Sequence, residues 1–165
     1  GGGPTIMTDI NASMLSVGRD RAINQGLVSD LSFCVVDAEA IPLRDMSVDR
    51  VSIAFGLRNC TDKLAVIREA RRVLRPGGRF LCLEFSKVQV AALAPIYDTW
   101  SFKVLPTMGG LIAKDRESYQ YLAESIRMFP DQETLADMFR QAGLSHVKYQ
   151  SLSGGIAAIH SGWRL

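Results

Sequence analysis

Apolar residues along this chain follow two alternating patterns, short continuous runs and longer segments with helical spacing. Continuous runs occupy residues 31–36, 48–55 and 80–85, and each is bounded by Gly, Pro or Asp. Such runs are typical of strands that are covered on both faces, as in parallel sheets. A further short strand is predicted over residues 5–9, where it ends in a carboxylate. The chain should therefore contain a mostly parallel sheet.

Helical spacing predicts the connections between these strands. Residues 11–24 form a helix closed by Gly26, and residues 63–74 form an amphipathic helix. A third helix is capped by Asp131 and ended by Gly143. Strands that alternate with helices predict an α/β fold, with a doubly wound sheet and helices on both faces.

Three segments depart from the alternation. Residues 75–78 (Arg-Pro-Gly-Gly) should stop the preceding helix in a tight turn, because proline disfavours helix and glycine permits positive φ. Residues 88–129 are helical and rich in aromatic residues, which predicts a lid insertion. Strands over 146–151 and 156–161 predict an antiparallel hairpin at the sheet edge.

Composition supports one soluble domain over residues 1–165. Hydrophobic residues make up 47% of the 165 positions and charged residues 22%, enough apolar surface for a core. The formal net charge of +2 and the scattered Lys and Arg do not indicate nucleic-acid binding. The apolar runs are shorter than the roughly 20 residues that span a bilayer. The three cysteines lack metal-ligand spacing, so no metal is expected.

Polar residues follow several predicted strands and form five motifs. These are Asp9-Ile-Asn-Ala-Ser-Met14, Asp37-Ala-Glu-Ala-Ile-Pro42, Asp49-Arg-Val-Ser-Ile-Ala-Phe-Gly-Leu-Arg-Asn59, Arg75-Pro-Gly-Gly78 and Leu83-Glu-Phe-Ser86. With these motifs the chain resembles the S-adenosylmethionine-dependent class I C-methyltransferases of ubiquinone biosynthesis, the UbiE family, in its mitochondrial-type branch. The resemblance runs from Asp9 to the C-terminus.

This resemblance implies a C-methyltransferase with S-adenosyl-L-methionine as its cofactor. The implied reaction is methylation of a ring carbon of a polyprenyl methoxybenzoquinol. Methylation of a menaquinone-type naphthoquinol is the near alternative. A non-catalytic scaffold in a quinone-biosynthesis complex is the alternative from another class of protein.

The implied cofactor residues are Asp9, Ile10, Asp37, Ala38 and Ala54. In the family, a carboxylate at the position of Asp9 binds the ribose hydroxyls, Asp37 and the Ala38 N–H address the adenine, and Ala54 contributes only its backbone. Asp9 could equally be a helix cap, and Asp37 an ordinary Asx turn.

Arg58 and Asn59 are the implied catalytic pair. A fixed cation and an amide can stabilise the phenolate that makes the quinol ring nucleophilic. A guanidinium is effectively always protonated, so Arg58 is not expected to act as a base. The alternative is a surface ion pair from Arg58 to Asp62 with a turn-forming Asn59. The role of Glu84 stays open, and both His146 and His160 are expected at the surface of strand edges.

Family members begin their sheet with a strand and a glycine-rich turn, and this sequence has no such motif. The chain therefore resembles the C-terminal part of the family protein, with the first strand missing. In the family that strand lies between the strand ending at Asp9 and the one ending at Ala54. Its absence leaves two unpaired edges, so we expect an isolated chain to oligomerise or rearrange.

The resemblance also implies partners and a location. These are a polyprenyl quinol substrate, a quinone-biosynthesis protein complex, peripheral membrane contact and no nucleic acid. The implied location is the matrix side of the mitochondrial inner membrane, with the bacterial cytoplasm as the alternative.

Overall fold

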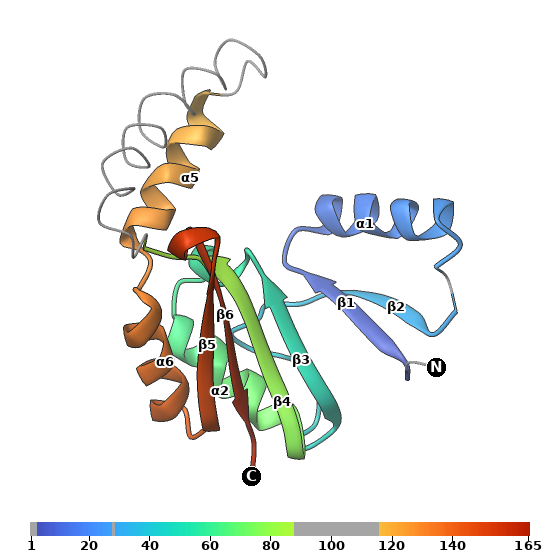
Figure 1. Ribbon diagram of the computed structural model, residues 1–165. Coiled ribbons are helices and arrows are strands. Elements are labelled where there is room, and N and C mark those ends of the chain that lie inside the picture. The colour runs from blue at the N-terminus through green and yellow to red at the C-terminus, as the bar shows by residue number, and fades with distance from the viewer. Residues whose placement is uncertain (1–2, 28, 88–115) are drawn as a thin grey trace.

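In the part of the chain that the structure describes, the strands form two separate sheets (Figure 1). The computed structural model describes residues 3–27, 29–87 and 116–165. Strands β1 (Thr5–Asp9) and β2 (Leu31–Val35) pair in parallel. The second sheet has the order β3-β4-β6-β5, and its strands are β3 (Val48–Ala54), β4 (Leu74–Phe85), β5 (Ser145–Leu152) and β6 (Ala157–Trp163). The predicted α/β fold is confirmed.

The four-stranded sheet mixes parallel and antiparallel pairing. β3 runs parallel to β4, with Val51 opposite Phe80. β6 is antiparallel to both of its neighbours, and Cys82 of β4 lies opposite His160. The predicted C-terminal hairpin is confirmed, with β6 inside the sheet and β5 at its edge.

Within the described residues four α-helices accompany the sheets, and polar side chains cap three of them. The helices are α1 (Ala12–Asn24), α2 (Lys63–Val73), α5 (Arg116–Met128) and α6 (Gln132–Gln141). Asn11 caps α1, Asp62 caps α2 and Asp131 caps α6, each by accepting backbone N–H groups of the first turn. These starts agree with the sequence pattern. In the described ranges, no helix is both long and apolar enough to cross a membrane.

The hydrophobic core lies between the four-stranded sheet and the helices α2 and α6. Phe80 of β4 and Phe139 of α6 stack with ring centroids 5.0 Å apart, and both are fully buried. Ile67 and Leu135 complete this contact from the two helices. The helical faces predicted from apolar spacing are the faces that pack.

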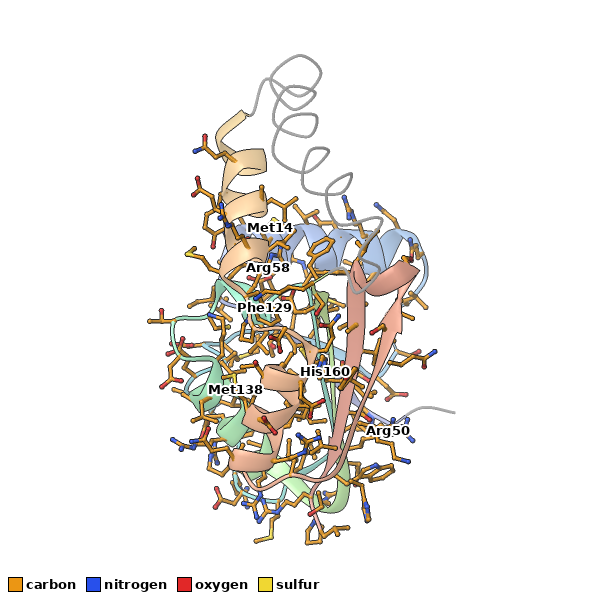
Figure 2. All side chains as sticks on the ribbon, turned by 60° about the vertical axis from the view of Figure 1, so that its left-hand side comes forward. Met14, Arg50, Arg58, Phe129, Met138 and His160 are labelled. Atoms are coloured by element: carbon orange, nitrogen blue, oxygen red, sulfur yellow. The ribbon has the colours of Figure 1, made fainter. Side chains whose placement is uncertain are left out.

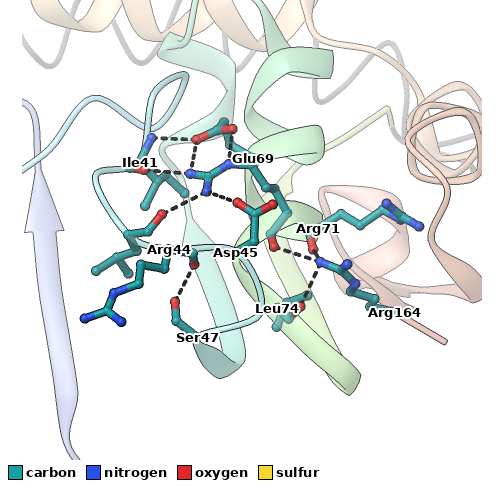
Figure 3. A network of polar contacts seen from close by, with 10 residues as sticks. Ile41, Arg44, Asp45, Ser47, Glu69, Arg71, Leu74 and Arg164 are labelled. Atoms are coloured by element: carbon teal, nitrogen blue, oxygen red, sulfur yellow. Dashed lines mark hydrogen bonds and ion pairs between the residues drawn. The ribbon is translucent and has the colours of Figure 1, made fainter.

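A polar network fastens the loop before β3 to helix α2 (Figure 3). Arg72 donates from Nη2 to the Ile41 carbonyl at 2.7 Å and from Nη1 to the Leu43 carbonyl at 2.8 Å. The same guanidinium bonds Glu69 through Nε at 2.7 Å, and Glu69 accepts the Ile41 N–H. The Arg72 hydrogen bond is the main cause that lowers the pKa of Glu69. The Arg72 guanidinium thus binds the loop at two backbone carbonyls, those of Ile41 and Leu43.

Two expectations about β-structure are corrected. The Arg75-Pro-Gly-Gly78 segment is not a separate turn but an irregular part of β4, between the pairs Val48–Leu74 and Arg50–Arg79. Gly77 does take the positive φ expected, at 79°, and a side chain on Gly78 would meet the Arg75 carbonyl at 2.8 Å.

The expectation that the apolar runs are covered on both faces is wrong for β2. Its residues are half-buried or exposed, and Val35 is 53% exposed. The physical reason is that, among the described residues, β2 pairs with one strand, the exposed β1, and α1 is the helix that packs against the two strands.

His160 is not at the surface but 1% exposed, whereas His146 is exposed as expected. The His160 ring lies 5.3 Å from Tyr149 and 6.0 Å from Phe139, and its Nε2 is 2.8 Å from the Gln132 carbonyl. The expectation failed because β6 is an inner strand rather than an edge.

Part of the predicted lid over residues 88–129 lies outside the described residues, which resume at Arg116 with α5. Tyr97, Trp100 and Phe102 are among the aromatic residues that fall outside.

Candidate active site

The site forms where β3 and β4 end, from a turn that carries Arg58 and Asn59. After β3 the chain passes Phe55 and Gly56 into the short 3₁₀ helix η1 (Leu57–Asn59). Leu57 is fully buried in the core and anchors this turn. Figure 2 shows Arg58 near the base of α5, above the sheet. Polar side chains at the carboxyl ends of parallel strands are where α/β proteins place their ligands.

Glu84, the penultimate residue of β4, holds the turn in place. The Arg58 backbone N–H donates to Glu84 Oε1 at 3.1 Å, and Arg58 Nη1 lies 3.3 Å from both carboxylate oxygens. The Phe85 N–H also donates to Glu84 Oε2 at 3.1 Å. The two side chains are 12% and 2% exposed. The alternative pairing of Arg58 with Asp62 is wrong, since Asp62 caps α2 instead.

The Arg58 guanidinium is enclosed on one side and open on the other. Nη1 also donates to the Phe55 carbonyl, and the guanidinium carbon lies 5.4 Å from the Phe85 ring centroid. Nε is buried without a partner among the described residues. Nη2 makes no hydrogen bond in the described ranges and is not enclosed in this way. It is the part of the group that can donate to a ligand.

Asn59 is oriented by a residue that sequence patterns did not single out for this role. Tyr121 of α5 donates its hydroxyl to Asn59 Oδ1 at 3.1 Å, and the tyrosine is 55% exposed. Because the amide oxygen is engaged, the amide NH₂ of Asn59 is the free donor of this side chain. The signal in the sequence was only that Tyr121 belongs to an aromatic-rich helical segment.

Phe55 is the strained position of the turn. Its φ is 53°, a left-handed conformation that costs a non-glycine residue about 1–3 kcal/mol. Its N–H continues the β3–β4 ladder to the Leu83 carbonyl at 2.9 Å, and its ring lies 4.7 Å from the Phe85 ring. Such strain is concentrated at functional sites, and here it directs the chain from the strand into the Arg58 turn.

The expected cofactor residues lie on the strand ends of both sheets. Asp9 is exposed, and its Oδ1 accepts the Asn11 N–H at 2.8 Å, so it is not the cap of α1. Ile10 is 69% exposed and Ala54 is exposed. Asp37 forms the Asx turn that was the alternative, with Oδ1 accepting the Glu39 N–H at 2.9 Å. The other carboxylate oxygen, Oδ2, of both Asp9 and Asp37 makes no hydrogen bond within the described residues.

Glu39 connects the loop that carries Asp37 to the loop that follows Arg58 and Asn59, although no sequence pattern indicated this role. Its Oε1 accepts the N–H groups of Thr61 and Asp62 at 2.7 and 3.0 Å. The loop after β2 is thereby tied to the loop after η1. Burial, with Glu39 adding to it, raises the pKa of the Cys60 thiol. Cys60 therefore stays neutral and is a poor nucleophile.

Comparison with known proteins identifies the family. The profile of the ubiE/COQ5 methyltransferase family matches residues 2–164. The chain belongs to this family. It is 70% identical over all 165 residues to the ubiquinone/menaquinone biosynthesis C-methyltransferase UbiE of Acidiphilium cryptum, covering 66% of that protein. It is 53% identical to the Marinomonas UbiE, with 98% of the chain and 64% of the relative covered.

This member of the ubiE/COQ5 methyltransferase family spans about two thirds of the length of these relatives. Both relatives are bacterial, which fits the bacterial alternative for location better than the mitochondrial one. A SAM-dependent methyltransferase of Thermotoga maritima has a similar fold, with a TM-score of 0.68, 19% identity and coverage of 98% of this chain and 73% of that structure. The expected class I methyltransferase fold is thereby confirmed.

Proposed function

We propose that this chain forms the greater part of an S-adenosylmethionine-dependent C-methyltransferase that methylates a quinol ring in ubiquinone biosynthesis. The observation that carries the proposal is the Arg58-Asn59 turn, fixed by Glu84 at the carboxyl ends of β3 and β4. The 70% identical relative named for ubiquinone/menaquinone biosynthesis supports it.

The strand-end residues fit S-adenosylmethionine. The second oxygen of Asp9 is free to accept a ribose hydroxyl, and Asp37 and the Ala38 N–H, neither closed off by the Asx turn, suit the adenine. Ile10 would pack against the cofactor with an exposed side chain, and Ala54 would offer its backbone. When bound, the cofactor supplies an electrophilic methyl group on sulfur.

Arg58 and Asn59 would stabilise negative charge on the quinol oxygen. The free Nη2 of Arg58 and the amide NH₂ of Asn59 are donors on adjacent residues of one turn. Both are held before substrate arrives, Arg58 by Glu84 and Asn59 by Tyr121, so little reorganisation is required as charge develops. Neither group removes the proton, because a guanidinium is effectively always charged in proteins and a side-chain amide is not a base. Water is the proton acceptor we propose.

The substrate we propose is a polyprenyl methoxybenzoquinol, with a demethylated naphthoquinol as the alternative. The name of the Acidiphilium cryptum relative includes both ubiquinone and menaquinone. A polyprenyl tail would bring the protein to a membrane surface from the bacterial cytoplasm, as a peripheral protein that associates with other proteins of quinone biosynthesis.

A non-catalytic scaffold remains the second candidate. The edge of β1 that has no strand partner among the described residues favours it, because such an edge can bind a partner strand. The two functions are separated by cofactor binding and methyl transfer. A scaffold requires neither.

The test is methyl transfer by a chimera in which residues 1–165 replace the matching segment of the Acidiphilium cryptum relative. Transfer of labelled methyl from S-adenosylmethionine to short-tailed benzoquinol and naphthoquinol would be measured. We expect transfer to the benzoquinol and a loss of at least about a hundredfold in Asn59→Ala. The matched control is Asn24→Ala, at the end of α1. Equal rates in the two variants would contradict the role of Asn59.

A further inference from the structure

Two carboxylates from different loops hold the turn that carries Asn59. Glu84 of β4 holds the start of this turn, where it accepts the Arg58 N–H at 3.1 Å. Glu39, in the loop after β2, holds the end of the turn. Its Oε1 accepts the N–H groups of residues 61 and 62 at 2.7 and 3.0 Å. The backbone on either side of Asn59 is therefore fixed by a carboxylate.

The backbone around Glu39 is itself held on both sides. The Glu39 N–H donates to Asp37 Oδ1 at 2.9 Å. Ile41, two residues further along, donates its N–H to Glu69 at 2.8 Å, and its carbonyl accepts from Arg72 at 2.7 Å (Figure 3). The Glu39 carboxylate thus extends from a loop whose backbone is fixed by hydrogen bonds, and it can hold the next loop at a defined place.

The bond from Glu39 to the start of α2 replaces one that the helix lacks the residue to make. Asp62 is the N-cap of α2, and its side chain accepts the Ala65 N–H at 3.0 Å. In a capping box, a glutamate at the position of Ala65 would accept the N-cap N–H in return. Alanine cannot do so, and Glu39 accepts this N–H from another loop. A local glutamate would cap the helix equally well, but it would not join the two loops.

We propose that Glu39 is a positioning residue for methyl transfer, which fixes the Asn59 turn relative to the loop that holds the cofactor. The inference rests on the proposed function, in which Asp37 and the Ala38 N–H bind the adenine and Asn59 stabilises the quinol oxygen. Residues 37–39 would then contact the cofactor at one end and the catalytic turn at the other. A misplacement of about 1 Å between reacting groups can cost about a hundredfold in rate.

Glu39 would act through the backbone rather than on the cofactor or the quinol. Its Oε1 is occupied by two backbone N–H groups, and the residue is half-buried. Removing the carboxylate leaves the bond from the Glu39 N–H to Asp37, because that bond uses the main chain. The cofactor loop should therefore keep its shape while the Asn59 turn loses one of its two carboxylates. The expected signature is a lower kcat with little change in the KM for S-adenosylmethionine.

Methyl-transfer kinetics of the chimera test this signature. Glu39→Ala should lower kcat for the benzoquinol by at least about tenfold and change the KM for S-adenosylmethionine by less than about threefold. Glu39→Gln keeps an oxygen that can accept the same N–H groups, and kcat should stay within about threefold of the unaltered chimera. The matched control is Glu133→Ala, which removes a carboxylate from the first turn of α6 and should leave kcat unchanged. Unchanged kcat in Glu39→Ala would overturn the proposal.

A second substitution separates positioning from simple capping of α2. Adding Ala65→Glu to Glu39→Ala returns a partner to the Asp62 N–H from within the helix and completes a capping box. The urea midpoint should then return toward that of the unaltered chimera, while kcat should stay at least about tenfold lower. Ala65→Glu alone is the control for the added glutamate and should leave kcat unchanged. Recovery of kcat together with stability would show that Glu39 only caps the helix.

Hydrogen exchange of single amides, measured by NMR, tests the positioning without methyl transfer. The N–H groups of Asn59 and Cys60 donate to carbonyls at the start of the turn. Both should exchange at least about tenfold faster in Glu39→Ala and in the double variant, because the turn opens more often. The Thr134 amide, bound by the Asp131 cap of α6, should be unchanged.

The exchange rates also separate this inference from the proposed function. A chimera that transfers no methyl group would contradict the proposed function, and the Asn59 and Cys60 amides would still decide whether Glu39 holds the turn. Equal exchange of these two amides with and without the Glu39 carboxylate would overturn the proposal. If Glu39→Ala alone does not fold, the double variant, which keeps the helix cap, takes its place in both comparisons.

Discussion

Arg58 and Glu84, 26 residues apart in sequence, are joined by three hydrogen bonds at the ends of neighbouring strands. The Arg58 N–H donates to Glu84 Oε1 at 3.1 Å, and Nη1 lies 3.3 Å from each carboxylate oxygen. Parallel pairing of β3 and β4 brings the two residues together, since Ala54 lies opposite Leu83. The carboxylate therefore fixes both the backbone and the side chain of the arginine.

Replacing Glu84 with glutamine should destabilise the chain strongly. Glu84→Gln leaves the Arg58 charge without its counter-ion in a site where the carboxylate is 2% exposed. Removing one partner of a buried ion pair costs about 3 kcal/mol of unfolding free energy. Urea unfolding of the chain measures this loss. The control is Asp49→Asn, which breaks the exposed pair with Arg75 and should cost less than about 1 kcal/mol. Equal losses would contradict the account.

The Tyr121 hydroxyl should affect the reaction more than the stability. Tyr121→Phe removes the hydrogen bond to Asn59 Oδ1 and releases the amide, while the half-exposed ring keeps its place. A net hydrogen bond of about 1 kcal/mol corresponds to a three- to tenfold lower kcat of the chimera. Unfolding free energy should change by less than about 0.5 kcal/mol. The control is Tyr149→Phe, on β5, which should leave kcat unchanged. An equal decrease of kcat in both variants would show that Tyr121 does not position Asn59.

His160 should make the stability depend on pH between neutral and mildly acid conditions. Burial lowers the pKa of His160, although its bond to the Gln132 carbonyl opposes this. The unfolded chain therefore binds the proton first, and stability is lost as pH falls from about 6.5 toward the lower folded pKa. Urea unfolding at several pH values should show this slope, and His160→Gln should flatten it. His146→Gln, at an exposed position, should retain it.

Glu69 titrates in a separate, more acid window. The Arg72 hydrogen bond lowers the pKa of Glu69, so its contribution is complete above about pH 4.3 and is lost as pH falls below that value. A second decline in stability should thus survive in His160→Gln. Its absence would contradict the role given to the Glu69–Arg72 pair.

Arg72 should contribute to stability through several bonds rather than through one ion pair. Arg72→Ala removes contacts to the Ile41 and Leu43 carbonyls and to Glu69 and Asp45. We expect a loss of about 2 kcal/mol, since the side chain is 32% exposed and solvent screens part of the interaction. Arg68→Ala, an exposed position on the same helix, should change stability by less than about 0.5 kcal/mol.

Local patterns in the sequence were sufficient for most elements of the fold. Asp131 caps α6, and the apolar spacing of residues 63–74 matches α2 to within one residue. Both features depend on neighbours within a few positions, where helix propensity and capping operate. The parallel pairing of β3 with β4 also followed from the helix between them.

Features that depend on distant parts of the chain could not be predicted in the same way. His160 is buried because β6 enters the sheet between β4 and β5, which no local pattern in the strand specifies. The Tyr121–Asn59 bond joins residues 62 positions apart. The resemblance to a family gave Arg58 and Asn59, but only the structure gives Glu84 and Tyr121 as the residues that hold them.

Titration of S-adenosylhomocysteine into the chimera, by calorimetry, tests the cofactor site on which the proposed function depends. We predict saturable 1:1 binding that Asp9→Ala weakens by at least about tenfold. The variant removes the exposed strand-end carboxylate that would accept hydrogen bonds from the ribose hydroxyls. Asp20→Ala, an exposed carboxylate on α1, should bind as the unaltered protein does. Binding that is absent, or that is equal in the Asp9 and Asp20 variants, would contradict a methyltransferase site at these strand ends.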